Sequence, residues 1–167
     1  MKTKSLSYRA FPGHERGTIL RLLRESYQDF SQTNERLVEQ WDNDWRQYDD
    51  DVFDFPETVG ASGFITYQGE ILIGFASWDP RVFPTAIVGH NCILPAYRRN
   101  GFGKRQIEEM LKRLASRGFT KARAKTGDHP GFVAARRLYL ACGFRKIDRR
   151  PSQADAGFSL LVFERDL

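Results

Sequence analysis

Helix-like and strand-like apolar patterns follow one another along the 167-residue chain in an order that neither alternates strictly nor falls into two blocks. Apolar residues at the three-to-four-residue spacing of an amphipathic helix occur over 14–30, 33–48, the segment after Gly101, and 132–142. Strand-like runs cover 5–11, a hairpin over 63–78 that turns near Gln68 and Gly69, and 85–94, 119–126, 144–149 and 158–166. The resulting order, β-α-α-β-β-β-α-β-α-β-β, predicts a mixed sheet flanked by helices.

Two glycines and two neighbouring arginines stand where the strand-like run at 85–94 gives way to a helix, in the pattern Arg98-x-x-Gly101-x-Gly103. The first turn of a helix has backbone N–H groups without intrahelical partners, and glycine lets a phosphate approach them closely. The pattern therefore predicts a pyrophosphate-binding loop, with a glycine-rich turn and solvated arginines as the alternative. A Walker loop is excluded by sequence, and Gln106 stands where a Rossmann fingerprint needs Gly or Ala.

A second pattern, Ala135-x-x-Leu138-Tyr139-x-x-x-Gly143-Phe144, describes a helix that ends at a glycine. It follows the pattern Ile93-x-Pro95-x-Tyr97-Arg98-x-x-Gly101-x-Gly103 in the sequence. Together the two resemble the GNAT superfamily of acetyl-CoA-dependent N-acetyltransferases. The match is dense from about residue 87 to residue 146 and coarse in the first half of the chain.

The resemblance implies an α+β (mixed α/β) fold, with a mixed, mostly antiparallel sheet of about seven strands and about four helices. The length fits a single N-acetyltransferase domain over residues 1–167. The implied activity is direct transfer of the acetyl group from acetyl-CoA, as cosubstrate, to a primary amine, without a metal. A CoA-binding regulatory module without turnover and a basic nucleic-acid-binding domain are the two alternatives.

The resemblance also implies which residues hold acetyl-CoA. Arg98 would support the loop, and backbone N–H groups would bind the pyrophosphate at Arg99, Asn100, Gly101, Phe102, Gly103 and Lys104. The strand before the loop would have free backbone groups that pair with the pantetheine arm, one N–H polarising the thioester carbonyl, at Cys92, Ile93 and Leu94. Ala135 and Phe132 complete the set on the later helix, with Phe132 standing where the family usually has Asn.

Direct transfer needs a neutral amine, yet an alkyl amine with a pKa of about 10.4 is almost fully protonated at pH 7. The strand at 85–94 contains no Asp or Glu, so the carboxylate base of some family members is missing there. His90 on that strand and Asp79 at a strand end are the candidate bases, and a water chain is a third alternative. Tyr139 matches the general acid of the family, and the alternative is a core aromatic on the apolar helix face.

Residues 41–57 contain seven carboxylates and five aromatic side chains, and Arg46 is the one opposing charge. Carboxylates and aromatic faces both favour a cationic amine, so Asp49, Asp50 and Asp51 are predicted to attract the acceptor. The alternative is a solvated helix end and loop whose aromatic residues anchor it to the core.

The formal net charge is +5, and residues 98–150 carry sixteen Lys/Arg against four acidic residues. The basic half also contains the predicted loop, so a phosphate-rich coenzyme is a sufficient anionic partner. Because the sequence has no helix-turn-helix, zinc or RNP1-type signature, we expect no nucleic acid partner. The acceptor, a small molecule or a protein amine, is left open, as is the choice between monomer and homodimer.

Cys92 and Cys142 lack C-x-x-C spacing and predict packed thiols in a reducing compartment, with a disulfide as the alternative. The three histidines are too scattered to predict a metal site. No apolar run has membrane-spanning length, and the first residues lack the apolar region of a secretory signal. We therefore expect a cytoplasmic protein without membrane contacts.

Overall fold

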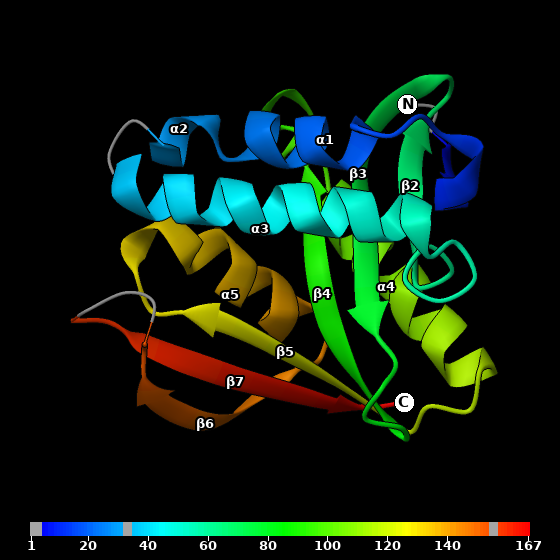
Figure 1. The fold of residues 1–167 in the computed structure, drawn as a ribbon. Helices are drawn as coiled ribbons and strands as arrows, with labels where there is room; N and C mark the ends of the chain where they lie inside the picture. Colours follow the sequence, from blue (N-terminus) through cyan, green and yellow to red (C-terminus); the bar gives the residue numbers. More distant parts are fainter. Residues whose placement is uncertain (1–4, 32–34, 154–156) are drawn as a thin grey trace. The chain divides into compact units, whose positions relative to one another are not determined.

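Figure 1 shows the computed structural model of the chain, which describes residues 5–31, 35–153 and 157–167. Its helices are α1 (Thr18–Ser26), α2 (Gln28–Ser31), α3 (Glu35–Asp54), α4 (Phe102–Ser116) and α5 (Val133–Ala141), with 3-10 turns η1 (Phe11–Gly13), η2 (Pro95–Tyr97) and η3 (Pro130–Phe132). Its strands are β1 (Leu6–Arg9), β2 (Gly63–Gln68), β3 (Ile71–Asp79), β4 (Thr85–Ile93), β5 (Lys121–Gly127), β6 (Arg145–Pro151) and β7 (Ser159–Asp166). Among the described residues, no helix has both the length and the apolar character that a membrane span requires.

The strands form a seven-stranded sheet in the order β1-β2-β3-β4-β5-β7-β6. The β4–β5 pair is parallel, whereas β1–β2, β2–β3, β5–β7 and β6–β7 are antiparallel. These findings confirm the predicted element order and the mixed sheet of an α+β fold. One difference is that the helix expected over 14–30 is divided into α1 and α2 at Tyr27.

The chain divides into two compact units, each made of two segments. The first unit contains residues 1–77 and 90–106, and the second contains residues 78–89 and 107–167. Three elements, β3, β4 and α4, contribute residues to both units, because the divisions fall after Ser77, after Gly89 and after Gln106. A single N-acetyltransferase domain over the whole chain stays a prediction.

In the first unit, α1 and α3 pack together and run in opposite directions, as the blue and cyan helices of Figure 1 show. Helix α1 packs against α3 because it presents an apolar stripe, and burying a large aliphatic side chain contributes about 1.5–3 kcal/mol to the free energy of unfolding. The buried cluster that α1 and α3 share with the strands of this unit consists of Phe11, Ile19, Leu22, Leu23, Trp45, Val52, Ile65, Tyr67, Phe75, Cys92 and Leu94.

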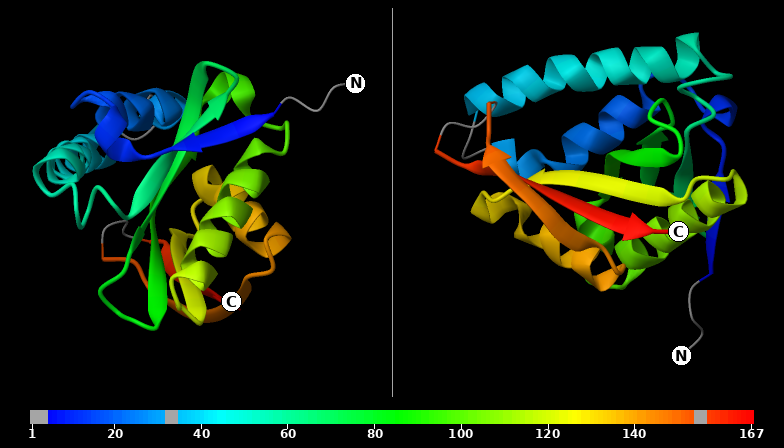
Figure 2. Two further views of the ribbon diagram at one scale, coloured as in Figure 1. Left: turned by 90° about the vertical axis from the view of Figure 1, so that its right-hand side faces the viewer. Right: turned by 90° about the horizontal axis from the view of Figure 1, so that it is seen from below.

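In the second unit, β5 pairs with β7 along its whole length, and β7 pairs with β6, so the three strands lie side by side in Figure 2. Helix α5 ends as predicted: Gly143 has a φ of +80°, and the Phe144 N–H donates to the Tyr139 carbonyl at 3.0 Å. Cys92 in the first unit and Cys142 in the second are both free and buried, as expected of packed thiols.

Candidate active site

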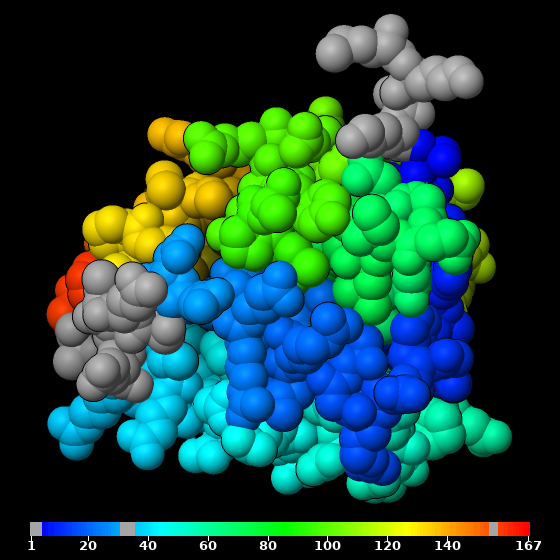
Figure 3. Space-filling model, turned by 90° about the horizontal axis from the view of Figure 1, so that it is seen from above, coloured from blue at the N-terminus to red at the C-terminus, as the bar shows by residue number. Residues whose placement is uncertain are grey.

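The loop after β4 is braced by Arg98. Its Nε donates to the Ile93 carbonyl at 2.9 Å, and a terminal nitrogen donates to the Ser26 carbonyl at the end of α1 at 2.6 Å. Figure 3 shows the blue surface of α1 beside the bright green surface of the segment that follows β4. The Arg98 guanidinium therefore joins the strand end to a helix end, and its part in binding acetyl-CoA stays a prediction.

The chain between Arg98 and α4 adopts an uncommon backbone conformation. Arg99 has a φ of +60° and Gly101 a φ of +75°, and a left-handed conformation costs a non-glycine residue roughly 1–2 kcal/mol. The Asn100 side chain stabilises the turn by donating to the carbonyls of Arg98 at 2.9 Å and Tyr97 at 3.3 Å. Strained residues of this kind are concentrated at ligand-binding loops.

The first turn of α4 follows immediately. Phe102 is buried against Ile73 and Ile93, which anchors the helix start to the strands. The Arg105 N–H donates to the Gly101 carbonyl at 3.2 Å. The N–H groups of Phe102, Gly103 and Lys104 precede it, and they carry the positive end of the helix dipole.

At the end of β4, a backbone N–H that was expected to be free is hydrogen-bonded. The Leu94 N–H donates to the Ile73 carbonyl at 2.8 Å, so the expectation of a free donor does not hold for that group. The reason is the close approach of β3: a Cβ on Gly74 would lie 2.1 Å from the Cys92 carbonyl oxygen. The N–H that polarises the thioester carbonyl would therefore have to come from another residue of this strand.

The Cys92 side chain has a packing role. Burial raises the pKa of its thiol to about 11, so Cys92 is no nucleophile at neutral pH.

Gln106 is a residue that the sequence reasoning missed. It is 1% exposed, accepts a hydrogen bond from the Thr66 hydroxyl at 2.6 Å, and donates to the carbonyls of Phe75 at 2.8 Å and Cys92 at 3.3 Å. The helix that carries the loop is thereby joined to β2, β3 and β4. One signal was available: Gln106 lies one helical turn before Met110, on the apolar stripe, where a polar side chain needs partners.

His90 lies on β4 and faces α3. Its ring centre is 4.9 Å from that of Tyr48, and its carbonyl accepts a hydrogen bond from the Ser77 hydroxyl at 2.7 Å. Burial lowers the pKa of His90, and the charge of Asp44 partly opposes this shift. The imidazole is therefore neutral at pH 7 and has a lone pair that can accept a proton.

Asp79, the other candidate base, ends β3 in the second unit. The Arg81 guanidinium donates to both of its carboxylate oxygens, with the shortest distance 2.6 Å. This hydrogen bonding lowers the pKa of Asp79, which makes the carboxylate a weaker proton acceptor than an ordinary aspartate. Asp79 is thus held in an ion pair with Arg81, and the role of either residue as a base stays a prediction.

Tyr139, Ala135 and Phe132 belong to the second unit, whereas the loop belongs to the first. Tyr139 is 5% exposed, and its ring centre lies 5.5 Å from that of Phe144 and 6.0 Å from that of Phe163. Phe132 precedes α5 at its N-terminal cap, and Ala135 is half-buried in the first turns. Packing thus accounts for the Tyr139 ring, and its role as general acid stays a prediction.

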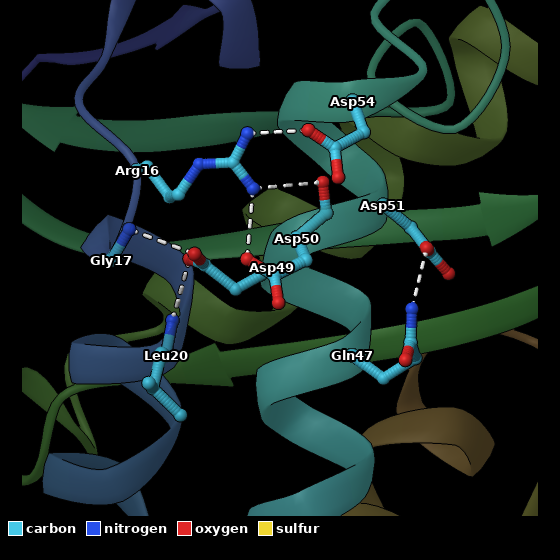
Figure 4. A network of polar contacts seen from close by, with 8 residues as sticks. All are labelled: Arg16, Gly17, Leu20, Gln47, Asp49, Asp50, Asp51 and Asp54. Carbon is cyan, nitrogen blue, oxygen red and sulfur yellow. Dashed lines mark hydrogen bonds and ion pairs between the residues drawn. The ribbon is translucent and has the colours of Figure 1, made fainter.

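The acidic segment differs from the expected helix end and loop, because α3 continues to Asp54 (Figure 4). Asp49 is 3% exposed and accepts hydrogen bonds from the N–H groups of Gly17 at 2.7 Å and Leu20 at 3.0 Å. Because Gly17 has no capping side chain, Asp49 caps α1 from the neighbouring helix. These tertiary contacts outweigh the low helix propensity of aspartate.

The two acids that follow Asp49 also have partners in Figure 4. Asp50 forms an ion pair with Arg16 at 2.8 Å, and Asp51 accepts a hydrogen bond from Gln47 at 2.9 Å. Attraction of an acceptor by these three aspartates stays a prediction, but Asp49 in particular is committed to the start of α1.

The chain is similar in sequence to a known acetyltransferase over part of its length. The chain is 33% identical over 87 residues to the mycothiol acetyltransferase of Streptosporangium roseum, covering 52% of this chain and 24% of the relative. The chain thus spans about a quarter of the length of that curated relative.

Two solved structures share the fold over nearly the whole chain. The PaiA N-acetyltransferase of Thermoplasma acidophilum, solved with coenzyme A, gives a TM-score of 0.78 at 16% identity and covers 98% of this chain and 99% of its own. A GNAT-family protein of Desulfovibrio desulfuricans gives a TM-score of 0.76 at 13% identity, covering 97% of this chain and 98% of its own. The sequence profile of the acetyltransferase (GNAT) family matches residues 19–144. Because this match covers well over half of the chain, the chain belongs to the acetyltransferase (GNAT) family.

Proposed function

We propose that the chain transfers the acetyl group of acetyl-CoA directly to a primary amine. The loop between β4 and α4 carries the proposal, because two positive-φ residues, Arg99 and Gly101, lead into the positively polarised N-terminus of α4. The PaiA relative, which was solved with coenzyme A, supports the same cosubstrate here. Arg99 on the loop and Lys104 in the first turn of α4 are exposed and add the charge that a pyrophosphate needs.

The proposed reaction breaks one bond for each bond formed and gives each transferred proton a donor and an acceptor. The amine nitrogen attacks the thioester carbonyl, the new C–N bond forms, and the C–S bond breaks to release CoA thiolate. His90 would accept the proton that the amine loses, and Tyr139 would donate a proton to the thiolate. The role of His90 agrees with a neutral imidazole, since burial lowers its pKa.

Calorimetry with acetyl-CoA tests the loop. Gly103→Val adds a branched side chain in the first turn of α4, so we expect acetyl-CoA affinity to fall at least about tenfold while the far-UV spectrum stays unchanged. Ser116→Val, at the far end of the same helix, is the matched control and should bind as the parent does. Equal affinity of Gly103→Val and the control would refute the cofactor site.

A panel of amines, followed by release of free CoA, tests the transfer. Turnover on at least one amine is the expected result. Acetyl-CoA binding without turnover on any amine would instead support the CoA-binding regulatory module. Salt-sensitive oligonucleotide binding without acetyl-CoA binding would support the nucleic-acid alternative.

A further inference from the structure

Gln106 contacts three strands through one buried amide group. The amide nitrogen donates to the carbonyls of Phe75 on β3 at 2.8 Å and Cys92 on β4 at 3.3 Å. The amide oxygen accepts a hydrogen bond from the Thr66 hydroxyl on β2 at 2.6 Å. Both N–H groups of the amide are thus in use, as is its oxygen. Because Gln106 is 1% exposed and Thr66 is fully buried, bulk water does not compete for these groups.

The amide meets the sheet where the pairing of the strands is irregular. The register of β2 and β3 shifts between Thr66 and Tyr67. Strand β3 also approaches β4 so closely that a Cβ on Gly74 would lie 2.1 Å from the Cys92 carbonyl oxygen. An irregular ladder leaves buried backbone groups that need other partners. The Gln106 side chain provides such a partner for the Cys92 carbonyl.

The segment held in this way is the end of β4. Residues 92–94 are those expected to pair with the pantetheine arm of acetyl-CoA. The Gln106 amide donates to the first carbonyl of this segment, that of Cys92, and the Arg98 Nε donates to the second, that of Ile93, at 2.9 Å. Side chains from the loop and from α4 therefore fix the position of the strand end.

The other end of the cosubstrate is expected at the N-terminus of α4, which begins at Phe102. Residues four apart on a helix lie on one face, so Gln106 is one turn from Phe102, whose ring is buried against Ile73 and Ile93. One helical turn is about 5.4 Å long. A single rigid turn thus connects the proposed pyrophosphate site to the amide that holds Cys92.

We propose that Gln106 is a positioning residue for acetyl-CoA, which fixes the distance between the pyrophosphate site at the start of α4 and the thioester end at β4. This inference rests on the cofactor site of the proposed function. A ligand that binds two elements at once gains the affinity of both only when they are held at the spacing of the ligand. A ligand that occupies one element is insensitive to that spacing. Gln106 therefore favours the complete coenzyme over its halves.

Calorimetry with CoA and with its phosphate half tests the proposal without turnover. The half is 3′-phospho-ADP, which keeps the pyrophosphate and lacks the pantetheine arm. Gln106→Leu removes both donors at similar volume, so we expect the Kd for CoA to rise about three- to tenfold and the Kd for 3′-phospho-ADP to stay unchanged. Met110→Ala truncates a fully buried side chain one turn further along α4 and is the control for lost stability. It should bind both ligands as the parent does.

The outcomes separate this proposal from the cofactor site itself. If Gln106→Leu binds CoA as tightly as Met110→Ala does, the positioning role is overturned and the cofactor site stands. If Gln106→Leu loses affinity for both ligands equally, the phosphate site is damaged and the spacing argument fails. A parent that binds neither ligand would overturn the cofactor site, and the positioning role with it.

Gln106→Glu adds a readout that lost packing would not change. An ionised carboxylate has no proton to donate to the carbonyls of Phe75 and Cys92, whereas a protonated carboxyl keeps one donor. Burial among acceptors raises the pKa of a carboxyl. Relative to the parent, Gln106→Glu should therefore bind CoA weakly at about pH 8 and recover affinity toward about pH 6, while Gln106→Leu stays weak throughout. The same pH dependence in both variants would show that Gln106 does not act as a donor.

Discussion

Asp49 is the residue whose replacement best tests how α3 holds α1. Asp49→Ala removes a buried carboxylate that accepts the N–H groups of Gly17 at 2.7 Å and Leu20 at 3.0 Å. Gly17 is the N-terminal cap of α1 and Leu20 is its third residue, so both N–H groups lack intrahelical partners. The variant therefore leaves the start of α1 without its cap.

The expected loss follows from these contacts. Losing a helix cap costs about 0.5–2 kcal/mol, and hydrogen bonds to a charged group contribute about 1.5–3 kcal/mol. Alanine regains about 0.5 kcal/mol of helix propensity, so we expect a net loss of about 2–3 kcal/mol. For a chain of this size that corresponds to a Tm lower by about 4–12 °C.

Urea unfolding followed by circular dichroism measures this loss. Asp51→Ala is the matched control, because its contact is one exposed hydrogen bond from Gln47 on the same helix. We expect the control to lose less than about 0.5 kcal/mol. If Asp49→Ala and Asp51→Ala unfold at the same urea concentration, the capping role assigned to Asp49 is refuted.

Three further predictions concern single residues. Tyr139→Phe removes the hydroxyl and keeps the ring, so a general-acid role predicts a kcat lower by at least about tenfold, with little change in the acetyl-CoA KM. If the variant has the kcat of the parent under conditions where chemistry limits turnover, Tyr139 is a packing residue. Gln106→Leu removes the partner of the buried Thr66 hydroxyl, and we expect urea unfolding to show a loss of about 2–4 kcal/mol, whereas a loss near zero would contradict the joining role of Gln106. Burial lowers the pKa of His90 in the folded state, so the folded protein prefers the neutral imidazole. This contribution to the free energy of unfolding is present above the unfolded-state pKa of about 6.5. It is lost as the pH falls through the lower pKa of the folded state. His90→Gln should reduce the loss of stability on acidification from about pH 7 to pH 5, and an identical pH dependence would count against this assignment.

Much of the fold was predictable because periodicity is a local property. The stripe of Ile19, Leu22 and Leu23 indicates a helix wherever its neighbours lie, and the hairpin turn at Gly69 follows from a residue that adopts positive φ. The end of α3 was not predictable in the same way. Aspartates are poor helix formers, and only their contacts with Arg16 and the start of α1 explain why the helix reaches Asp54.

The sequence by itself determined the family, the order of elements and the loop with its glycines, because each depends on residues close together in the chain. Only the tertiary structure decided which polar side chains have partners. It buries Gln106 against three strands, commits Asp49 to the start of α1 and leaves Asp44 without a partner in the described part of the chain. These outcomes depend on hydrogen-bonding groups tens of residues away in sequence, and a buried polar atom must find such a partner wherever the fold brings one.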